Sequence, residues 1–349
     1  MRGLYRPLAV TTIVLMGLLV ACGDDDDGGD TATNDATDTG GDTGGEGDGF
    51  TIGFTNPLGS NDQLAILQAS IEARAECLGG DVVSVDADLD VDKQISDIDQ
   101  LVSQDVDGII VFPLDADAVE PAVERAVEAG ITVVGVNVTL EDPDAEDIAP
   151  FDASVNQGTE QMANETAEFV IEQLDGSGNV LGIGIGFPVP VIQFQMATMQ
   201  AAVEDGGLTW VEQVDNPTDD SAGAQPVVEQ ALLRFDDLQA IMAYNEPSAL
   251  GAYAAVQAAG RTDDILITGA NGTDAGVQAV EAGEIGATWD LLPWKQGVTF
   301  VNVMRSLLDG EEVDTTTVVP VQMLTADNLD EQVDWDQAVT DIADCKIED

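Results

Sequence analysis

From residue 50 onward, short apolar runs alternate with longer segments in which apolar residues recur at helical spacing. The run 51–55 comes first, and the segment 62–78 then places Leu64, Leu67 and Ile71 on one helical face. The same alternation continues to residue 290. It predicts strands at 51–55, 82–85, 108–112, 132–136, 180–185, 209–214, 240–243, 265–269 and 286–290. It predicts helices at 62–78, around 95–102, and at 118–129, 157–174, 192–203, 223–233, 247–259 and 275–282.

The predicted strands are continuous runs rich in Val and Ile rather than alternating apolar and polar residues. Such strands are typical of sheets that helices cover on both faces. The repeated order of strand, helix and strand indicates parallel, doubly wound sheets. The elements form two series, separated by the acidic segment around 141–150. The sequence therefore predicts the α/β class, with two lobes that are each built on a doubly wound parallel sheet.

The first 22 residues have the order of a secretory signal. Arg2 and Arg6 precede an apolar run at 8–20, which is too short to cross a bilayer, and Ala21 stands before Cys22. The tetrad LVAC at 19–22 resembles the lipobox of bacterial lipoproteins, which implies lipid modification of Cys22 and attachment to the outer side of the cell membrane. The alternative is an ordinary signal peptide with a chance cysteine. Residues 23–49 are mostly Asp, Gly, Thr and Ala, a composition that predicts a disordered tether.

Charge and residue usage exclude several functions. The 349 residues carry a formal net charge of −57 with only three lysines, which disfavours nucleic acid and anionic ligands. Histidine is absent, so the commonest general base and metal ligand is missing. The Asp-rich run 86–92 resembles a calcium loop, but Val91 stands where the sharp turn needs Gly. We predict no cofactor, no metal site and no catalytic residues.

Two further cysteines remain, Cys77 and Cys345. In an oxidising compartment they can pair and tie the C-terminal tail to the predicted helix 62–78. The alternative is two free thiols, because the spacing alone does not show whether the two sulfur atoms meet.

Carboxamide side chains follow several predicted strands or begin the helices after them. Ligands of open parallel sheets bind beyond the carboxyl ends of the strands, so two facing lobes would enclose one cleft. A carboxamide both donates and accepts, which suits hydroxyl groups, and Tyr244, Trp289 and Trp294 could cover the C–H face of a ring. A single Asn after a strand is also ordinary turn chemistry. The candidate ligand-binding residues are Asn61, Gln63, Asn137, Gln193, Gln195, Asn245, Asn271, Trp289 and Asp290.

Four stretches carry a resemblance to a known family. They are GIIVFPLDADAV at 108–119, AGITVVGVN at 129–137, YNEPSALGA at 244–252 and GANGTDAG at 269–276. Over roughly 50–321 the chain resembles the type I periplasmic binding proteins of ribose- and galactose-type sugar transporters. The resemblance implies ligand contacts at Asn61, Asn137, Val138, Gln195, Asn245 and Asn271.

The same resemblance implies how the lobes are assembled. The first lobe would comprise 51–153 and about 292–324, and the second 154–291 and about 325–349, with hinges near Asp152, Leu291 and Leu324. It also implies an extracytoplasmic, monomeric and non-catalytic protein that closes on its solute and delivers it to an ABC permease.

The chain departs from the family pattern at charged positions. Asn137 and Asn271 stand where the family has acids, both family arginines are missing, and Gln63 and Leu64 replace an aromatic pair. Neutral hydrogen bonds would thus replace stronger charged ones, which predicts a neutral pocket and a small neutral polyhydroxylated ligand.

The sequence also bears on three other functions. A lipoprotein that senses a sugar-like signal and presents it to a membrane receptor remains an alternative. A glycan-processing enzyme needs an acid and a base in the cleft, and Asp290 alone does not supply both. A DNA-binding repressor would need an N-terminal recognition helix, which the sequence does not predict.

Overall fold

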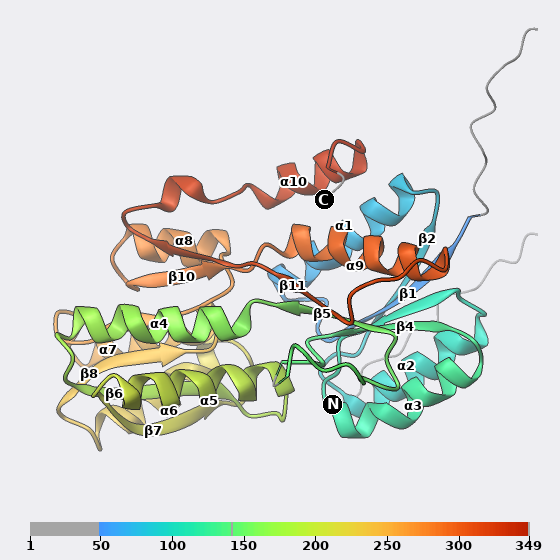
Figure 1. Ribbon diagram of the computed structural model, residues 1–349. Coiled ribbons are helices and arrows are strands. Elements are labelled where there is room, and N and C mark those ends of the chain that lie inside the picture. Colours follow the sequence, from blue (N-terminus) through green and yellow to red (C-terminus); the bar gives the residue numbers. More distant parts are fainter. Residues whose placement is uncertain (1–48, 141, 348–349) are drawn as a thin grey trace, which may run out of the picture. The chain divides into compact units, whose positions relative to one another are not determined.

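The computed structural model describes residues 49–140 and 142–347, which form two six-stranded sheets with flanking helices (Figure 1). The predicted signal, Cys22 and most of the predicted tether lie outside the described residues. None of the helices within 49–140 and 142–347 combines the length and the apolar character that crossing a membrane requires. The prediction of an α/β protein with two parallel-sheet lobes is confirmed.

The first sheet has the strand order β11-β5-β4-β3-β1-β2, and every strand pair in it is parallel. Helices on its faces cover the apolar strands, and Ile52, Phe54, Leu67 and Ile71 are fully buried between them. The strands are β1 (Thr51–Asn56), β2 (Asp81–Asp86), β3 (Gly108–Val111), β4 (Thr132–Val136), β5 (Ala153–Gln157) and β11 (Thr316–Val319). The helices are α1 (Asp62–Cys77), α2 (Val91–Ser103), α3 (Ala116–Glu128) and α9 (Pro293–Leu308).

The second sheet has the order β12-β10-β9-β8-β6-β7, and only its edge strand β12 runs antiparallel, against β10. Its strands are β6 (Asn179–Ile185), β7 (Thr209–Asn216), β8 (Leu238–Ala243), β9 (Leu266–Thr268), β10 (Ala287–Asp290) and β12 (Gln322–Thr325). Its helices are α4 (Thr159–Gln173), α5 (Pro190–Asp205), α6 (Ser221–Leu232), α7 (Glu246–Ala258) and α8 (Asp274–Glu281).

The chain passes between the two sheets after Gln157, after Asp290 and between β11 and β12. The predicted lobe border at 153 and 154 is corrected, because β5 belongs to the first sheet through Gln157. Of the predicted hinge positions, Leu291 lies at a crossing. Asp152 precedes the first crossing by the whole of β5, and Leu324 lies inside β12.

The C-terminal tail folds onto the first lobe, whereas we expected it with the second. After the short 3-10 helix η1 (Leu329–Glu331), α10 (Trp335–Ala343) packs against α1 and α9. A disulfide joins Cys77 at the end of α1 to Cys345, with 5.6 Å between their Cα atoms. The tail therefore adds a fourth connection between the lobes, because β12 lies in the second sheet and α10 on the first lobe.

Candidate ligand-binding site

A cleft of about 110 Å³ lies where strands of both sheets end. From the first lobe it is lined by residues that follow β1, β3 and β5, and from the second by residues at the ends of the strands from β6 to β10. The volume is smaller than the roughly 150 Å³ cavity that accepts benzene, so the cleft has room for one small ring at most. Its polar lining residues are Asn61, Gln63, Gln157, Gln195, Asp219, Tyr244, Asn245 and Asn271, and the other lining residues are apolar.

The structure places five of the nine predicted residues in this cleft. They come from both lobes, and all five are partly or fully buried. These residues are Asn61, Gln63, Gln195, Asn245 and Asn271.

Two of these amides also begin helices. Asn61 Oδ1 accepts from the backbone N–H groups of Gln63 and Leu64 at the start of α1, at 3.1 and 3.2 Å. Asn245 Oδ1 accepts from Ser248 N at 3.0 Å and caps α7 in the same way. Capping uses the carbonyl oxygens and fixes both side chains at the strand ends, so what each can offer toward the cleft is its amide N–H₂ group.

Asp219 is a cleft residue that sequence analysis missed. It lies in the loop between β7 and α6 with φ at +57°. Its Oδ1 accepts from the Tyr244 hydroxyl and, at 2.7 Å, from Asn245 Nδ2. Asn61 of the first lobe lies close enough to lower the pKa of the same carboxyl. The prediction of a cleft without charged groups is therefore wrong at this position.

The environment of Asp219 changes its acidity. Burial raises the pKa of the Asp219 carboxyl above its ordinary value, the charge of Asp220 adds to this, and the hydrogen bonds from Tyr244, Asn245 and Asn61 oppose it. Burial and the charge of Asp219 also raise the pKa of the Tyr244 hydroxyl, which therefore stays protonated and donates. The signal available in the sequence was the Asp219-Asp220 pair, which follows the long strand β7 just as the amides follow theirs.

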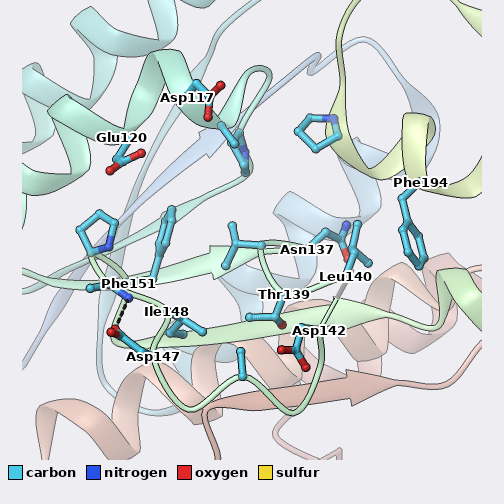
Figure 2. A pocket seen from close by; sticks show the side chains of 17 residues that line it. Asp117, Glu120, Asn137, Thr139, Leu140, Asp142, Asp147, Ile148, Phe151 and Phe194 are labelled. Atoms are coloured by element: carbon cyan, nitrogen blue, oxygen red, sulfur yellow. Dashed lines mark hydrogen bonds between the residues drawn. The ribbon is translucent and has the colours of Figure 1, made fainter.

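Asn137 lies beside the cleft rather than in it. With φ at +59°, it turns the chain after β4, and its Oδ1 accepts from the backbone of the cleft residue Gln157 at 2.8 Å. It lines a separate pocket of about 380 Å³ (Figure 2). Its buried Nδ2 has no hydrogen-bond partner in residues 49–140 or 142–347. The labelled acidic residues of this pocket are Asp117, Glu120, Asp142 and Asp147, and its labelled aromatic ones are Phe151 and Phe194.

Gln193, Trp289 and Asp290 do not line the cleft. Gln193 is exposed on α5, two residues from the buried Gln195, and residues two apart on a helix face different sides. Trp289 is 1% exposed, and its Nε1 donates to Thr166 Oγ1 at 2.8 Å. It packs beneath the cleft residues Met162, Ala270 and Leu291, so its contribution to the cleft is indirect.

Asp290 belongs to the crossing between the lobes. Its side chain is completely buried, and its Oδ1 accepts from Leu292 N at 2.9 Å and from Trp335 Nε1 of the tail at 3.1 Å. Oδ2 has no hydrogen-bond partner among the described residues, and burial raises the pKa of the carboxyl to about 6. The residue fixes the start of α9 and the tail, which is a structural task.

Two other aromatic or basic candidates also lie elsewhere. Trp294 packs with residues of α10 rather than against the cleft, and Lys295 is partly buried on α9 without lining it. Within the described part of the chain, no group of three or more Cys, Asp and Glu side chains is arranged to hold a metal ion.

Comparison with known proteins identifies relatives of the same architecture. The ribose import binding protein of Bacillus subtilis is 29% identical over 266 residues, covering 76% of this chain and 84% of the relative. A putative rhizopine-binding protein of Rhizobium meliloti is 30% identical over 279 residues, covering 76% and 87%. The xylitol-binding protein of Mycolicibacterium smegmatis is 29% identical over 257 residues, covering 70% and 68%.

A solved structure shares the fold over nearly its full length. It is an ABC transporter solute-binding protein of Bacillus halodurans with bound myo-inositol, which matches with a TM-score of 0.73 and 25% identity, over 83% of this chain and 98% of that one. The sequence profile of the periplasmic binding protein domain matches residues 52–312. The protein therefore belongs to the periplasmic binding protein family, whose members are non-catalytic solute-binding proteins that act outside the cytoplasm.

Proposed function

We propose that this protein is the solute-binding lipoprotein of an ABC importer, and that it binds a small neutral sugar or polyol between its lobes. The observation that carries the proposal is the meeting of amides from both lobes in one small cleft. Gln63 and Gln157 come from the first lobe and Gln195 and Asn271 from the second. Gln195 Nε2 donates to the backbone carbonyl of Tyr244 at 3.1 Å, which leaves its amide oxygen for a ligand. The remaining donors and acceptors of the four side chains match hydroxyl groups, and the apolar lining matches the C–H face of a ring.

Hinge closure would couple binding to transport. A solute that contacts both lobes stabilises the closed form by the additional contacts that only this form offers. The three crossings between the sheets would act as the hinge, and the permease would recognise the closed lobes. The names of the relatives support the solute class, since they include a ribose import binding protein and a xylitol-binding protein.

Attachment to the membrane rests on Cys22, which lies outside the described residues. The LVAC tetrad follows a short apolar run, and the acidic, Gly-rich segment after it is suited to a spacer. Cys22→Ser should move the protein from the detergent phase to the aqueous phase of a Triton X-114 partition. Partition of the wild type into the aqueous phase would contradict the anchor.

A thermal-shift screen against pentoses, hexoses, cyclitols and linear polyols tests the binding function. A ligand at 100 times its Kd should stabilise the folded protein by about 2.7 kcal/mol. For the best solute, Gln195→Ala should weaken binding by about tenfold, as expected for a lost hydrogen bond of about 1.4 kcal/mol. Gln193→Ala on the exposed side of α5 is the matched control and should leave the affinity unchanged. Equal effects of both variants, or no shift with any solute, would contradict the proposal.

Import is tested separately from binding. Deletion of the gene should abolish uptake of the best radiolabelled solute, and the wild-type gene should restore it. If uptake is undiminished in the deletion strain, the import role is contradicted, and the alternative is a binding protein that serves a sensory receptor.

A further inference from the structure

We propose that the preferred solute carries a protonated amino group in place of one hydroxyl, and that Asp219 selects it. The inference rests on the proposed sugar- or polyol-binding function of the same cleft. It changes the net charge of the expected solute from neutral to positive and keeps its polyhydroxylated character.

The first step is the charge of the cleft. Among residues 49–140 and 142–347, Asp219 is the one carboxyl side chain that lines the cleft, and no Lys or Arg of these residues lines it. The neighbours of Asp219 are the neutral groups Tyr244, Asn245 and Asn61, and the charge that acts on it is that of Asp220, which has the same sign. The cleft therefore holds a negative charge that no described side chain balances.

The basic side chains with ion-pair partners lie elsewhere. Within the described residues, these bases pair with acids at the surface of the two lobes. They are Lys93, Arg125, Arg234, Arg305 and Lys346. Arg261 donates to the backbone carbonyls of Phe235 and Leu238. Arg74 donates to Asn302 and Ile347, and neither Arg74 nor Lys295 lines the cleft. Among the described residues no base therefore supplies positive charge to the cleft, which leaves a solute as its source.

The second step concerns the positively charged partner that Asp219 lacks among the described residues. Its Oδ1 already accepts two neutral hydrogen bonds, so another hydroxyl would add a hydrogen bond and leave the charge unbalanced. A partly buried carboxylate is disfavoured without a counter-charge, which agrees with the raised pKa of this group. An ammonium group supplies three donors and the missing charge together, and hydrogen bonds between charged partners are the stronger class.

The third step is the rest of the cleft, which is suited to a ring with one charged substituent. Gln63, Gln157 and Asn271 line it with side chains that make no hydrogen bond to other described residues. These amides can take the hydroxyls of the same solute. Phe112 and the aliphatic lining exclude water around the ion pair, which strengthens it.

The test compares amines with their hydroxyl parents by isothermal titration calorimetry. The probes are D-glucosamine with D-glucose, D-galactosamine with D-galactose, and an amino-deoxyinositol with myo-inositol. In the wild type at neutral pH, at least one amine should bind about tenfold or more tightly than its parent. Asp219→Asn should abolish this preference and leave the affinity for the parent within a few-fold. Asp220→Asn removes the same charge one residue away, outside the cleft, and should keep the preference.

Each outcome separates the inference from the function on which it rests. If neutral parents bind and no amine binds more tightly, Asp219 does not select charge, and the proposed function stands. If neither parents nor amines bind, the proposed function itself fails. A preference that survives Asp219→Asn would come from the overall negative charge and would overturn the role of Asp219.

A second measurement, on the wild-type protein, tests the inference even if Asp219→Asn does not fold. In the wild type, raising the pH until the amine loses its proton should remove the preference, while the affinity for the parent stays constant. A preference that persists for the uncharged amine would overturn the inference.

Discussion

Replacing Asp290 with asparagine should make the protein more stable at pH 8 and change its stability little at pH 4. The side chain is fully buried at the crossing from β10 to α9. Its Oδ1 accepts from Leu292 N and from Trp335 Nε1, and its Oδ2 has no hydrogen-bond partner within the part of the chain that the structure describes. Burial raises the pKa of the carboxyl from 3.8 to about 6. Asparagine keeps the accepting oxygen and removes the charge.

The magnitude follows from proton linkage. A raised pKa means that the folded state binds the proton more tightly than the unfolded chain, in which Asp titrates near pH 3.9. The stability contribution of Asp290 is therefore full below about pH 4 and falls as the pH rises to about 6. Above that pH the ionised group costs about 3 kcal/mol, from roughly 1.4 kcal/mol for each unit of pKa difference. The NH₂ group of the new asparagine has no acceptor among the described residues, and neither has the OH group of the protonated aspartic acid. The two side chains should therefore contribute similarly to stability at low pH.

The assay is urea unfolding of both proteins from pH 4 to pH 8. The difference in the free energy of unfolding should grow between pH 4 and pH 6, by at most about 1.4 kcal/mol per pH unit, and then remain constant. Gln193→Ala, at an exposed neutral residue of α5, changes no titratable group and is the control that should give a flat difference. A flat difference for Asp290→Asn, or a variant less stable than the wild type at pH 8, would refute the reasoning.

Three other substitutions test the framework that holds the cleft. Serine at both Cys77 and Cys345 should lower the free energy of unfolding by roughly 2–5 kcal/mol, and dithiothreitol should then have no further effect on the melting temperature. Asn137→Ala should be about 1–2 kcal/mol less stable in urea than Asn137→Gly, because φ is +59° there, and the reverse order would contradict the strain argument. Gly297→Ala should lower stability by about 1–3 kcal/mol in the same assay, since its Cβ would lie 2.9 Å from Ile71 N, and an unchanged midpoint would contradict close packing of α1 and α9.

The fold was predictable because its central strands are buried on both faces. Such strands must be continuous apolar runs, and turns between them keep the order of strand and helix visible in the sequence. The strand β5, which lies between β11 and β4 in the first sheet, carries no such signal and was not predicted. The sequence of β5 is ASVNQ, and its polar side chains are buried because they bond to one another and to the neighbouring loop. Ser154 donates to Asn156 at 2.7 Å, and Asn156 donates to Thr139 at 2.9 Å.

The pattern of apolar and polar residues also does not predict where the C-terminal tail packs. The apolar face of α10 is visible in the sequence, but which lobe covers it depends on contacts between distant segments. Those contacts are the disulfide from Cys77 to Cys345 and the packing of α10 on α1. The family resemblance ends before this segment, so it supplied no constraint there.

Most of the wrongly predicted site residues lie one or two positions away in the sequence from residues that do line the cleft. The residue that reaches the cleft after β10 is Leu291, which lies just beyond the end of the strand, whereas Trp289 lies within β10 and is buried beneath it. On α5, the buried Gln195 and the exposed Gln193 are likewise two positions apart. Asp219 was missed because we looked for amides directly after strands, and β7 extends to Asn216, beyond its predicted end.

The caps at the strand ends limit how the cleft can distinguish solutes. Asn61 and Asn245 use their carbonyl oxygens to begin α1 and α7, and Asn245 gives an amide hydrogen to Asp219. These two residues therefore hold the frame and orient Asp219, and they have little left for a ligand. Recognition of hydroxyls then falls to Gln63, Gln157 and Asn271, together with the amide oxygen of Gln195, and all of these side chains are uncharged and adaptable. Because amides of this kind discriminate weakly among hydroxylated rings, the charge of Asp219 is the feature of the cleft that can separate one solute class from another.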